Sequence, residues 1–399
     1  MAEHYLDQSA TTRPSEAALS AMTEAAGVWG NPSSVHSLGQ KSAVLLRECR
    51  AKIAKTLGMP RVSKDMILFT SSGTEANNIA MQGCAFSKKR DPEKPGAIVI
   101  SQGEHPSVEN PAQRLESLGY RILRVPTLGG TLDLGWLEEQ LKSCPMPVIF
   151  AGFMLVNNET GAVYNVKAAS ALAKKYYPDA LVHCDAVQGY MKLKFTPQSL
   201  GADTVTVSAH KIHAIRGAAA LYVSENVLKR RHLVPVMPGG GQESGFRSGT
   251  ENLCSIASFA AAAEEARANF AENREKTAAL RARLDEGLSA LDVRFNRSSA
   301  AEDAEFIDNI CSIVLPAIKS ETMLNFLSSK NVYVSAGSAC SAYSKKKSTA
   351  LEAFGVTAED ADCTLRISLD HTNTDEDIDA VISALAEGIA SLQSLRKKK

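Results

Sequence analysis

Apolar runs and helical patterns alternate along the first 250 residues of the chain. Short apolar runs begin at Met66, Ala97, Val148, Ala180 and Thr204, and stretches with helical periodicity separate them. A strand of a parallel sheet is buried on both faces and therefore appears as a continuous apolar run. The alternation predicts an α/β fold in which helices cover both faces of a mostly parallel sheet.

The pattern changes after Asn252. Residues 257–290 are rich in Ala, Glu and Arg with helical periodicity, which predicts one or two long helices. Shorter apolar runs near Ile313, Val334 and Leu365 predict strands. A smaller α+β unit is expected from this part of the chain.

The change in pattern also suggests a domain division. A chain of 399 residues is long enough for roughly two or three domains. We expect residues 14–252 to form a large cofactor-binding domain. We expect residues 1–13 and 253–399 to form a small domain, with the N-terminal arm packed on it.

The bulk composition excludes several classes of partner. Forty-four basic and 44 acidic residues leave no net charge to attract nucleic acid or an anionic membrane. No stretch approaches the roughly 18 apolar residues of a membrane span, and the first residues lack the apolar core of a signal peptide. Eight cysteines without a CxxC pair indicate a reducing compartment. A cytoplasmic protein is predicted.

Two strand ends carry candidate chemistry. Lys211 follows the β-branched run of residues 204–207, and Asp185 ends the run that begins at Ala180. Both would lie at the carboxyl edge of the sheet, where open α/β sheets bind ligands. This pair suits pyridoxal phosphate, because an amine can condense with its aldehyde and a carboxylate can keep its pyridine nitrogen protonated. A surface lysine and a helix-capping aspartate are equally compatible with the spacing.

The segment FTSSGTEANN predicts a phosphate site. It supplies a strand over residues 67–69, a small turn, and a helix that Thr74 and Glu75 open. Free N–H groups at a helix start bind phosphate, Gly73 lets the backbone approach closely, and Thr74 adds a hydroxyl. An ordinary capping motif is the alternative. Neither GxxxxGK nor a GxGxxG after a strand is present, which disfavours nucleotide folds.

Arg366 is a candidate carboxylate clamp. In LRISL, Leu365, Ile367 and Leu369 alternate with Arg366, so a strand would place the arginine on the face away from the aliphatic side chains. A guanidinium fork matches the α-carboxylate of an amino acid. A solvated strand face is the alternative.

Cys340 differs from the other cysteines. It lies in AGSACSAYSKKKST, a segment of small and charged residues that is expected to be exposed. Lysines 345–347 can lower the pKa of its thiol, although they equally fit a solvated loop. Most of the others fall in patterns typical of buried cysteine: 49, 84, 144, 184, 254, 311 and 363. No metal site is predicted, since His210 and His213 lack an accompanying HExxH or CxxC pair.

Taken together, the motifs resemble those of the cysteine desulfurases, in the class V aminotransferase family of pyridoxal phosphate enzymes. The blocks follow the family's order over nearly the whole chain: YLDQSATT, GNPSSVHSLG, FTSSGTEANN, NNETGAV, HCDAVQ, SAHK, GGGQESGFRSGT, GSAC and LRISLDHTNT. The resemblance implies the fold-type I plan of a large and a small domain. The chain departs from the family pattern at Ala214, at Ile215 and at Lys345 to Lys347.

The resemblance implies roles for further residues. His105 would stack on the pyridine ring and serve in acid–base transfer, although a lone loop histidine is more often a surface residue. Gln188 would donate to the ring hydroxyl oxygen, and Asn158 would lie near that oxygen or the substrate carboxylate. Additional phosphate contacts are implied for Ser208, His210 and, from the neighbouring subunit of a homodimer, Thr250.

The implied activity is conversion of L-cysteine to L-alanine. Lys211 would take the α-proton, and Cys340 would receive the sulfur as a persulfide for an unidentified protein acceptor, as in iron–sulfur cluster assembly. A selenocysteine lyase would use the same residues. A class V aminotransferase or other β-lyase would not need Cys340.

Overall fold

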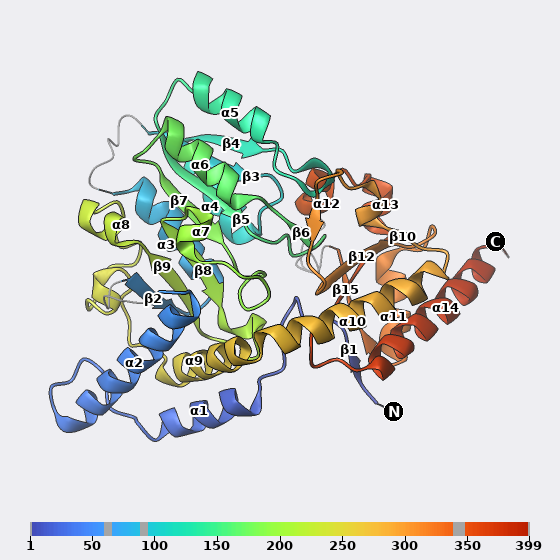
Figure 1. Ribbon diagram of the computed structural model, residues 1–399, viewed down its shortest axis with the longest axis horizontal. Coiled ribbons are helices and arrows are strands. Elements are labelled where there is room, and N and C mark those ends of the chain that lie inside the picture. The colour runs from blue at the N-terminus through green and yellow to red at the C-terminus, as the bar shows by residue number, and fades with distance from the viewer. Residues whose placement is uncertain (1, 60–65, 88–94, 338–347, 398–399) are drawn as a thin grey trace.

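The computed structural model describes residues 2–59, 66–87, 95–337 and 348–397. Figure 1 shows two layered parts, a large one around a seven-stranded sheet and a smaller one built from the C-terminal third of the chain. Cys340, one of the predicted catalytic residues, lies outside the described residues.

The large sheet is parallel except for one strand. Its order is β2-β9-β8-β7-β5-β3-β4, and only β9 runs antiparallel to its neighbours. This confirms the predicted mostly parallel sheet. The strands are β2 (Ile67–Thr70), β3 (Ala97–Ser101), β4 (Arg121–Val125), β5 (Val148–Met154), β7 (Leu181–Asp185), β8 (Thr204–Ser208) and β9 (Ala219–Val223).

Helices bury both faces of this sheet. On one face the core includes side chains of α1 (Glu16–Ala26), α2 (Ser37–Thr56), α5 (Leu134–Ser143), α6 (Val166–Tyr176) and α9 (Leu253–Ala268). On the other face it includes α3 (Gly73–Ala85), α4 (Pro106–Glu116) and α8 (Glu225–Arg230). Successive residues of β3 alternate between the two cores, as expected for a strand buried on both sides.

Short elements connect this layer. They are β6 (Ala162–Val163), α7 (Pro197–Leu200) and the 3₁₀ turns η2 (Leu128–Gly130), η3 (Ala209–Lys211) and η4 (Glu243–Gly245). The turn η3 matters most for the site, because it follows β8 directly and carries Lys211.

The C-terminal layer is an antiparallel sheet in the order β10-β12-β15-β14. Its strands are β10 (Arg294–Phe295), β12 (Ile310–Val314), β14 (Ser335–Ala336) and β15 (Thr364–Ser368). A separate core joins it to α10 (Phe270–Ser289), α11 (Ser320–Ser329) and α14 (Asp375–Lys397). The turn η5 (Asn296–Ser299) and helices α12 (Thr349–Phe354) and α13 (Ala358–Asp362) complete it.

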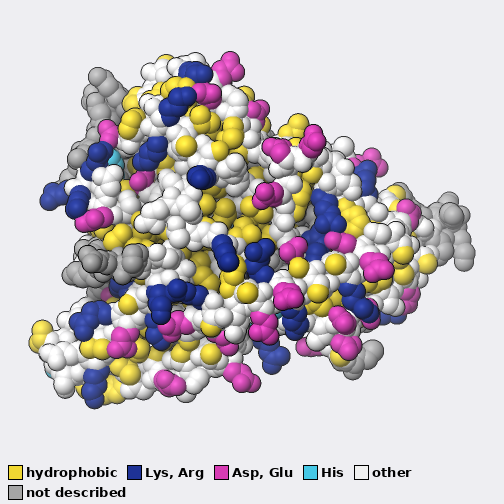
Figure 2. Space-filling view, viewed as in Figure 1, with side chains coloured by type: hydrophobic (Ala, Val, Ile, Leu, Met, Phe, Trp, Pro, Cys, Tyr) yellow, Lys and Arg dark blue, Asp and Glu magenta, His cyan; other side chains and the backbone are white. Residues whose placement is uncertain are grey.

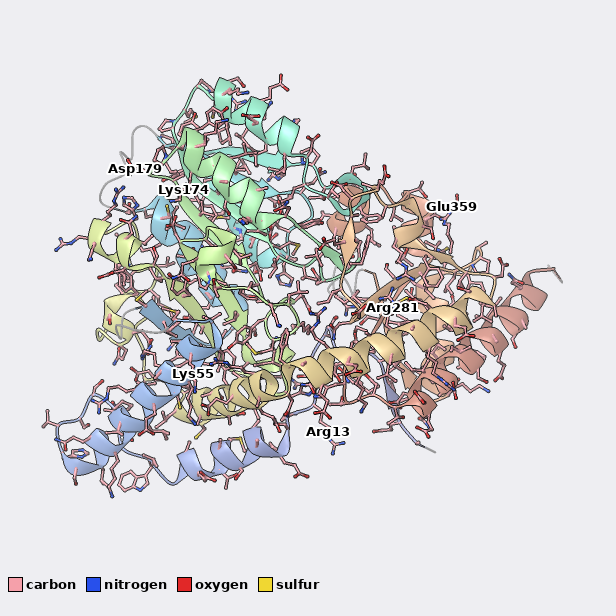
Figure 3. The ribbon with its side chains drawn as sticks, in the orientation of Figure 1. Arg13, Lys55, Lys174, Asp179, Arg281 and Glu359 are labelled. Carbon is pink, nitrogen blue, oxygen red and sulfur yellow. The ribbon has the colours of Figure 1, made fainter. Side chains whose placement is uncertain are left out.

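Helix α10 packs on the C-terminal layer and is bonded to its sheet. Arg281 is buried on α10 and donates from Nη1 to the carbonyl oxygen of Ile310, at the start of β12, over 2.6 Å (Figure 3). The predicted one or two helices over residues 257–290 are confirmed as α9 and α10, which Asn269 separates.

The N-terminal arm joins the two layers. Its strand β1 (His4–Tyr5) pairs with β13 (Val332–Tyr333), and Asp7 pairs with Ser368 at the end of β15. A second short connection pairs β6 with β11 (Glu305–Phe306). The arm therefore packs on the C-terminal layer before the chain enters α1. The division of the chain at residue 252 stays a prediction, since α9 packs on α1 and α2 of the large layer.

Basic and acidic side chains are interspersed over the face drawn in Figure 2. Across the part of the chain that the structure describes, every helix is too short or too polar to span a membrane.

Candidate active site

A cavity of about 370 Å³ lies where the carboxyl ends of the large sheet's strands meet the arm and β15. The sequence analysis placed the candidate chemistry at this edge. The cavity brings together ten predicted site residues: Gly73, Thr74, His105, Asn158, Asp185, Gln188, Ser208, His210, Lys211 and Arg366. Both Lys211 and Asp185 line the cavity, and Asp185 is buried rather than on the surface.

Carbonyl groups of the N-terminal arm hold Lys211. Its Nζ donates to the carbonyl oxygens of Ser9 over 2.6 Å and Ala10 over 2.8 Å. Ser9 is itself anchored, because its backbone N–H donates to Oγ of Ser368 over 2.9 Å. The amine therefore points into the cavity from η3, while the arm passes behind it.

Asp185 is buried, with 6% of its surface exposed, and its carboxylate has two donors. Oδ2 accepts from Nδ2 of Asn77 over 2.7 Å, and Oδ1 accepts from the backbone N–H of Val187 over 3.0 Å. Asn77 in turn contacts Nε2 of His183 at 3.0 Å through Oδ1. These bonds fix the carboxylate so that it faces the cavity.

His105 is held by its neighbour on α4. Nδ1 accepts from the backbone N–H of Ser107 over 3.1 Å and lies 2.8 Å from its hydroxyl oxygen. Burial lowers the pKa of His105, the Asp185 charge raises it less, and Lys211 lowers it further. The ring is therefore neutral near pH 7, which suits a flat apolar contact with an aromatic ligand.

The start of α3 forms the opposite end of the cavity. Ser72 caps this helix by accepting from the N–H of Glu75 over 3.2 Å, so the N–H groups before Glu75 face outward. A Cβ on Gly73 would come within 3.1 Å of a Val187 methyl group, so a larger residue here would crowd the cavity wall. Ser208 and His210 line the same end, and burial together with nearby positive charges lowers the pKa of His210 to about 4.

Arg366 reaches the cavity from the C-terminal layer. It is 3% exposed, so the solvated strand face considered above is wrong. Nη1 donates to the carbonyl oxygen of Asn158 and Nη2 to Oδ1 of Asp7, each over 2.9 Å. Its Nε is buried and has no partner among the described residues. A polar ligand in the cavity would give the Arg366 Nε its missing hydrogen-bond acceptor.

Gln188 lies in the cavity wall, but its amide is already engaged. Nε2 donates to the carbonyl oxygen of Ser9 over 3.0 Å, and Oε1 accepts from Nζ of Lys192 over 3.2 Å. The donation to a cofactor ring oxygen stays a prediction, as does the contact of the Asn158 side chain with ring or substrate.

Of the two remaining predicted residues, one stands apart from the cavity and the other lies outside the described residues. Thr250 is exposed and does not line it, so its role across a subunit boundary stays a prediction. Its segment is tied to α3, because Nε of Arg247 donates to Oε1 of Glu75 over 2.9 Å. Cys340 falls in residues 338–347, which the structure does not describe.

The sequence analysis missed several residues that shape the site. Asn77 had a usable signal, since it lies four positions after Gly73 on α3 and thus on the same helix face. Glu104 had none. It is buried under the site, and burial together with the Asp185 charge raises its pKa to about 8. Its Oε1 accepts from the N–H of Met154 over 2.6 Å, and its Oε2 has no partner among the described residues.

These residues fit pyridoxal phosphate. The cavity offers a helix start for a phosphate, a buried carboxylate for a ring nitrogen and an amine for an aldehyde. Three buried polar atoms without a partner among the described residues, on Ser9, Thr206 and Arg366, indicate that a polar ligand belongs at or beside this space.

The comparisons with known proteins agree with this chemistry. The Aminotransferase class-V family model matches residues 4–381. A NifS/IcsS protein homolog of Lactobacillus delbrueckii subsp. bulgaricus is 34% identical, with 96% of each chain covered. Cysteine desulfurase IscS 1 of Archaeoglobus fulgidus is 32% identical, with 98% of each covered. The chain therefore belongs to the class V aminotransferase family, which confirms the resemblance stated from the sequence.

A solved structure shows the same fold. The NifS-like protein of Rickettsia africae is 33% identical, covers 97% of this chain and 99% of its own, and superposes with a TM-score of 0.85. The predicted fold-type I architecture is thereby confirmed. The family is typically dependent on pyridoxal phosphate, which is the group that the cavity fits.

Proposed function

We propose that the chain is a cysteine desulfurase that uses pyridoxal phosphate. The meeting of Lys211, Asp185 and Arg366 at one cavity carries the proposal, because it joins an amine, a buried carboxylate and a carboxylate clamp. Two relatives named cysteine desulfurase, from Archaeoglobus fulgidus and Dictyoglomus turgidum, match almost the whole chain. A solved relative titled SspA in complex with cysteine is 29% identical, with a TM-score of 0.78.

The wall of the large layer would hold the cofactor. When bound, pyridoxal phosphate supplies an aldehyde that captures the substrate amine and a ring that accepts an electron pair from the α-carbon. The N–H groups at the start of α3, with Thr74, Ser208 and His210, would bind its phosphate. Asp185 would keep a proton on the ring nitrogen, and neutral His105 would lie against the ring.

The arm and β15 would hold the substrate. Arg366 would bind the α-carboxylate of L-cysteine through its unpartnered Nε and one Nη group. The Lys211 amine would take the α-proton of the bound substrate, since Lys211 lines the cavity. Arg366 would thus orient the substrate from the C-terminal layer, and Lys211 would transfer the proton from the large layer.

Cys340 would receive the sulfur. Its thiolate attacks the sulfur of the bound cysteine, an S–S bond forms, and the substrate's C–S bond breaks with its electron pair left on the carbon side. Protonation of that carbon gives L-alanine, and the enzyme holds a persulfide that a protein acceptor later removes. The overall exchange is L-cysteine plus enzyme thiol to L-alanine plus enzyme persulfide.

The proposal also includes an oligomeric state, a location and a sulfur acceptor. We infer a homodimer with Thr250 at the partner's cofactor, a cytoplasmic location, and an unidentified protein as sulfur acceptor. Selenocysteine lyase and an aminotransferase or β-lyase activity independent of Cys340 are the rivals.

Replacement of Cys340 separates these activities. Cys340→Ser should keep the spectral response to L-cysteine, because the residue acts after substrate binding, but alanine production should fall at least about a hundredfold in kcat. Cys144→Ser, a partly exposed cysteine outside the cavity, is the matched control. In the parent protein, brief exposure to cysteine should add one sulfur to the Cys340 peptide, detected by mass spectrometry.

The rivals give other results. Undiminished alanine from cysteine in Cys340→Ser would show a β-lyase mechanism. A much higher rate with selenocysteine than with cysteine, together with an indifferent Cys340, would show a selenocysteine lyase.

A further inference from the structure

Three side chains with metal-binding atoms meet beside the N-terminal arm. His213 follows η3, and Asp370 and His371 follow β15. One ligand atom from each lies within 4.8 Å of the others. None of the three lines the cavity of about 370 Å³, so the proposed reaction does not explain why they come together.

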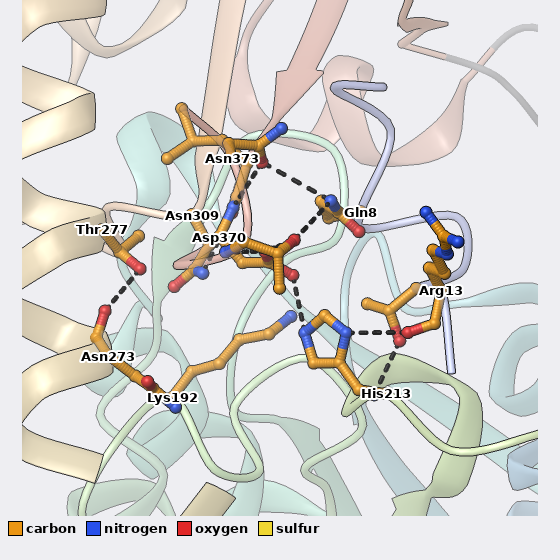
Figure 4. Close-up of polar contacts among 12 residues, drawn as sticks. Gln8, Arg13, Lys192, His213, Asn273, Thr277, Asn309, Asp370 and Asn373 are labelled. Atoms are coloured by element: carbon orange, nitrogen blue, oxygen red, sulfur yellow. Dashed lines mark hydrogen bonds and ion pairs between the residues drawn. The ribbon is translucent and has the colours of Figure 1, made fainter. Parts of the chain in front are cut away.

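The hydrogen bonds of His213 call for a cation. Its Nδ1 lies 2.9 Å from the carbonyl oxygen of Arg13, and its Nε2 lies 2.9 Å from Oδ2 of Asp370 (Figure 4). A carbonyl only accepts, so Nδ1 carries the ring proton. Nε2 of a neutral ring then offers a lone pair to a carboxylate oxygen. Such a contact requires either a second ring proton or a metal ion that binds both atoms from one side.

A second proton on the His213 ring would explain its contact with Asp370 but not why the His371 ring lies beside it. The rings of His371 and His213 lie edge to face with their centroids 5.0 Å apart. Among the described residues, no hydrogen bond is made by the His371 ring. A metal ion would use all three side chains at once, with Nε2 of His213, Oδ2 of Asp370 and one nitrogen of His371 as ligands.

The surrounding contacts orient these ligands. Oδ1 of Asp370 accepts from the N–H of Thr372 over 2.8 Å and from its hydroxyl over 2.6 Å, which leaves Oδ2 for the cluster. The backbone of His213 has φ 65°, an uncommon conformation for this residue, and Thr12 accepts from its N–H over 2.7 Å. A ring N–H bonded to a backbone carbonyl is typical of histidines that bind metal.

We propose that His213, Asp370 and His371 bind a divalent transition-metal ion, zinc or a metal of similar preference. Two imidazoles and one carboxylate suit this class of ion rather than calcium or magnesium. Tetrahedral zinc places its ligand atoms about 3.3 Å apart. On binding, the His371 ring must therefore turn inward, and Nε2 of His213 must move slightly away from Oδ2 of Asp370. All three side chains line a cavity of about 80 Å³, and His213 and His371 also line one of about 280 Å³.

Lys192 opposes this binding and sets its strength. Its side chain extends toward His213 and Asp370 (Figure 4). Part of its surface stays exposed, yet burial lowers the pKa of its amine to about 8. A protonated Lys192 repels a second cation, so we expect an affinity below that of a closed structural zinc site.

The bound ion would connect the large layer to the C-terminal layer, close to Lys211 in one and to Arg366 in the other. His213 is two residues beyond Lys211 on one side, and Asp370 is four residues beyond Arg366 on the other. The site itself does not depend on the proposed reaction, because its ligands lie outside the cofactor cavity.

The test is zinc binding by the cofactor-loaded protein with Cys340→Ser, which removes the Cys340 thiol as a competing ligand. Chelator-treated protein is titrated with zinc chloride against a chromophoric chelator. We expect one zinc per chain, and an affinity at least about tenfold lower in His371→Ala. His4→Ala is the matched control, since His4 pairs with Asp377 over 2.8 Å but belongs to no such cluster.

Cobalt gives a second measurement. Bound at the proposed site it should show visible bands without thiolate charge transfer, and these should vanish in His371→Ala and in Asp370→Asn. Circular dichroism and cofactor absorption confirm that each variant is folded. Absence of bound zinc, or equal affinity in His371→Ala and His4→Ala, overturns the proposal and leaves a protonated His213 paired with Asp370.

Discussion

The two walls of the cavity differ in how far their polar groups satisfy one another. On the wall of the large sheet, Asp185, Asn77 and His183 form a closed set of hydrogen bonds. On the opposite wall, Arg366 uses Asp7 and a backbone carbonyl but keeps a buried Nε without a partner among the described residues. The Asp185 carboxylate is therefore already oriented before a ligand arrives, although the Thr206 hydroxyl and Oε2 of Glu104 in the large layer also lack a partner among the described residues. The substrate wall is completed only by a ligand.

Loss of Lys211 should produce the largest effect, because Lys211 is the one lysine among the described residues that line the cavity. Lys211→Ala should lower alanine formation from cysteine by at least about a thousandfold. Borohydride treatment of the parent protein should fix the cofactor to the Lys211 peptide, as seen by mass spectrometry. A label on the Lys192 peptide would show that the wrong lysine has been assigned.

A change at Arg366, on the wall formed by the arm and β15, should weaken substrate binding rather than proton transfer. Arg366→Lys keeps the charge but loses the fork, so KM for cysteine should rise about ten- to hundredfold while cofactor retention stays normal. Arg281→Lys, at a buried arginine far from the cavity, is the control and should change stability alone. Equal losses of cofactor and substrate binding would remove the distinction between the walls.

Glu104 gives the cofactor wall a pH dependence. Its folded-state pKa is raised to about 8, above the usual value near 4.3. The folded protein therefore keeps a proton that the unfolded chain releases, and stability falls as the pH rises between these two values. Each pH unit is worth up to about 1.4 kcal/mol.

Urea unfolding of the cofactor-loaded protein measures this dependence. The parent should be about 1–2 kcal/mol less stable at pH 8 than at pH 6.5, and Glu104→Gln should reduce the difference. Glu24→Gln on the exposed side of α1 is the control. An unchanged pH slope in Glu104→Gln would mean that Glu104 is ionised in the folded protein.

Thr250 should give the smallest effect, since one hydroxyl contributes roughly 0.5–1.5 kcal/mol. Thr250→Ala should weaken cofactor retention a few-fold, measured by dialysis against a range of cofactor concentrations. Unchanged melting of the protein would show that the loss is local. A fully active monomer in sedimentation would contradict its role in the partner's site.

Sequence reasoning worked where one element decided a residue's place. Lys211 and Asp185 each end a buried strand of one sheet, so strand order alone brings them to a common edge. The side of β15 on which Arg366 lies was predicted from the alternation of aliphatic and polar residues along that strand. These predictions needed no knowledge of how distant segments pack.

The residues that sequence reasoning missed depend on long-range packing. The carbonyls of Ser9 and Ala10 reach Lys211 only because the arm pairs with the C-terminal layer. His213 was compared with His210, its neighbour in sequence, whereas its partner in space is Asp370. No local pattern predicts a contact across so many residues.

The pairing of the N-terminal arm has a consequence for synthesis of the chain. Ser9, which holds the Lys211 amine, is itself anchored by Ser368, 359 residues later. The arm leaves the ribosome first but must wait for β15, one of the last elements to emerge, before it takes its final place. The large sheet can form early, whereas the lysine cavity closes at the end. A nascent chain therefore holds no finished cavity until β15 has emerged from the ribosome.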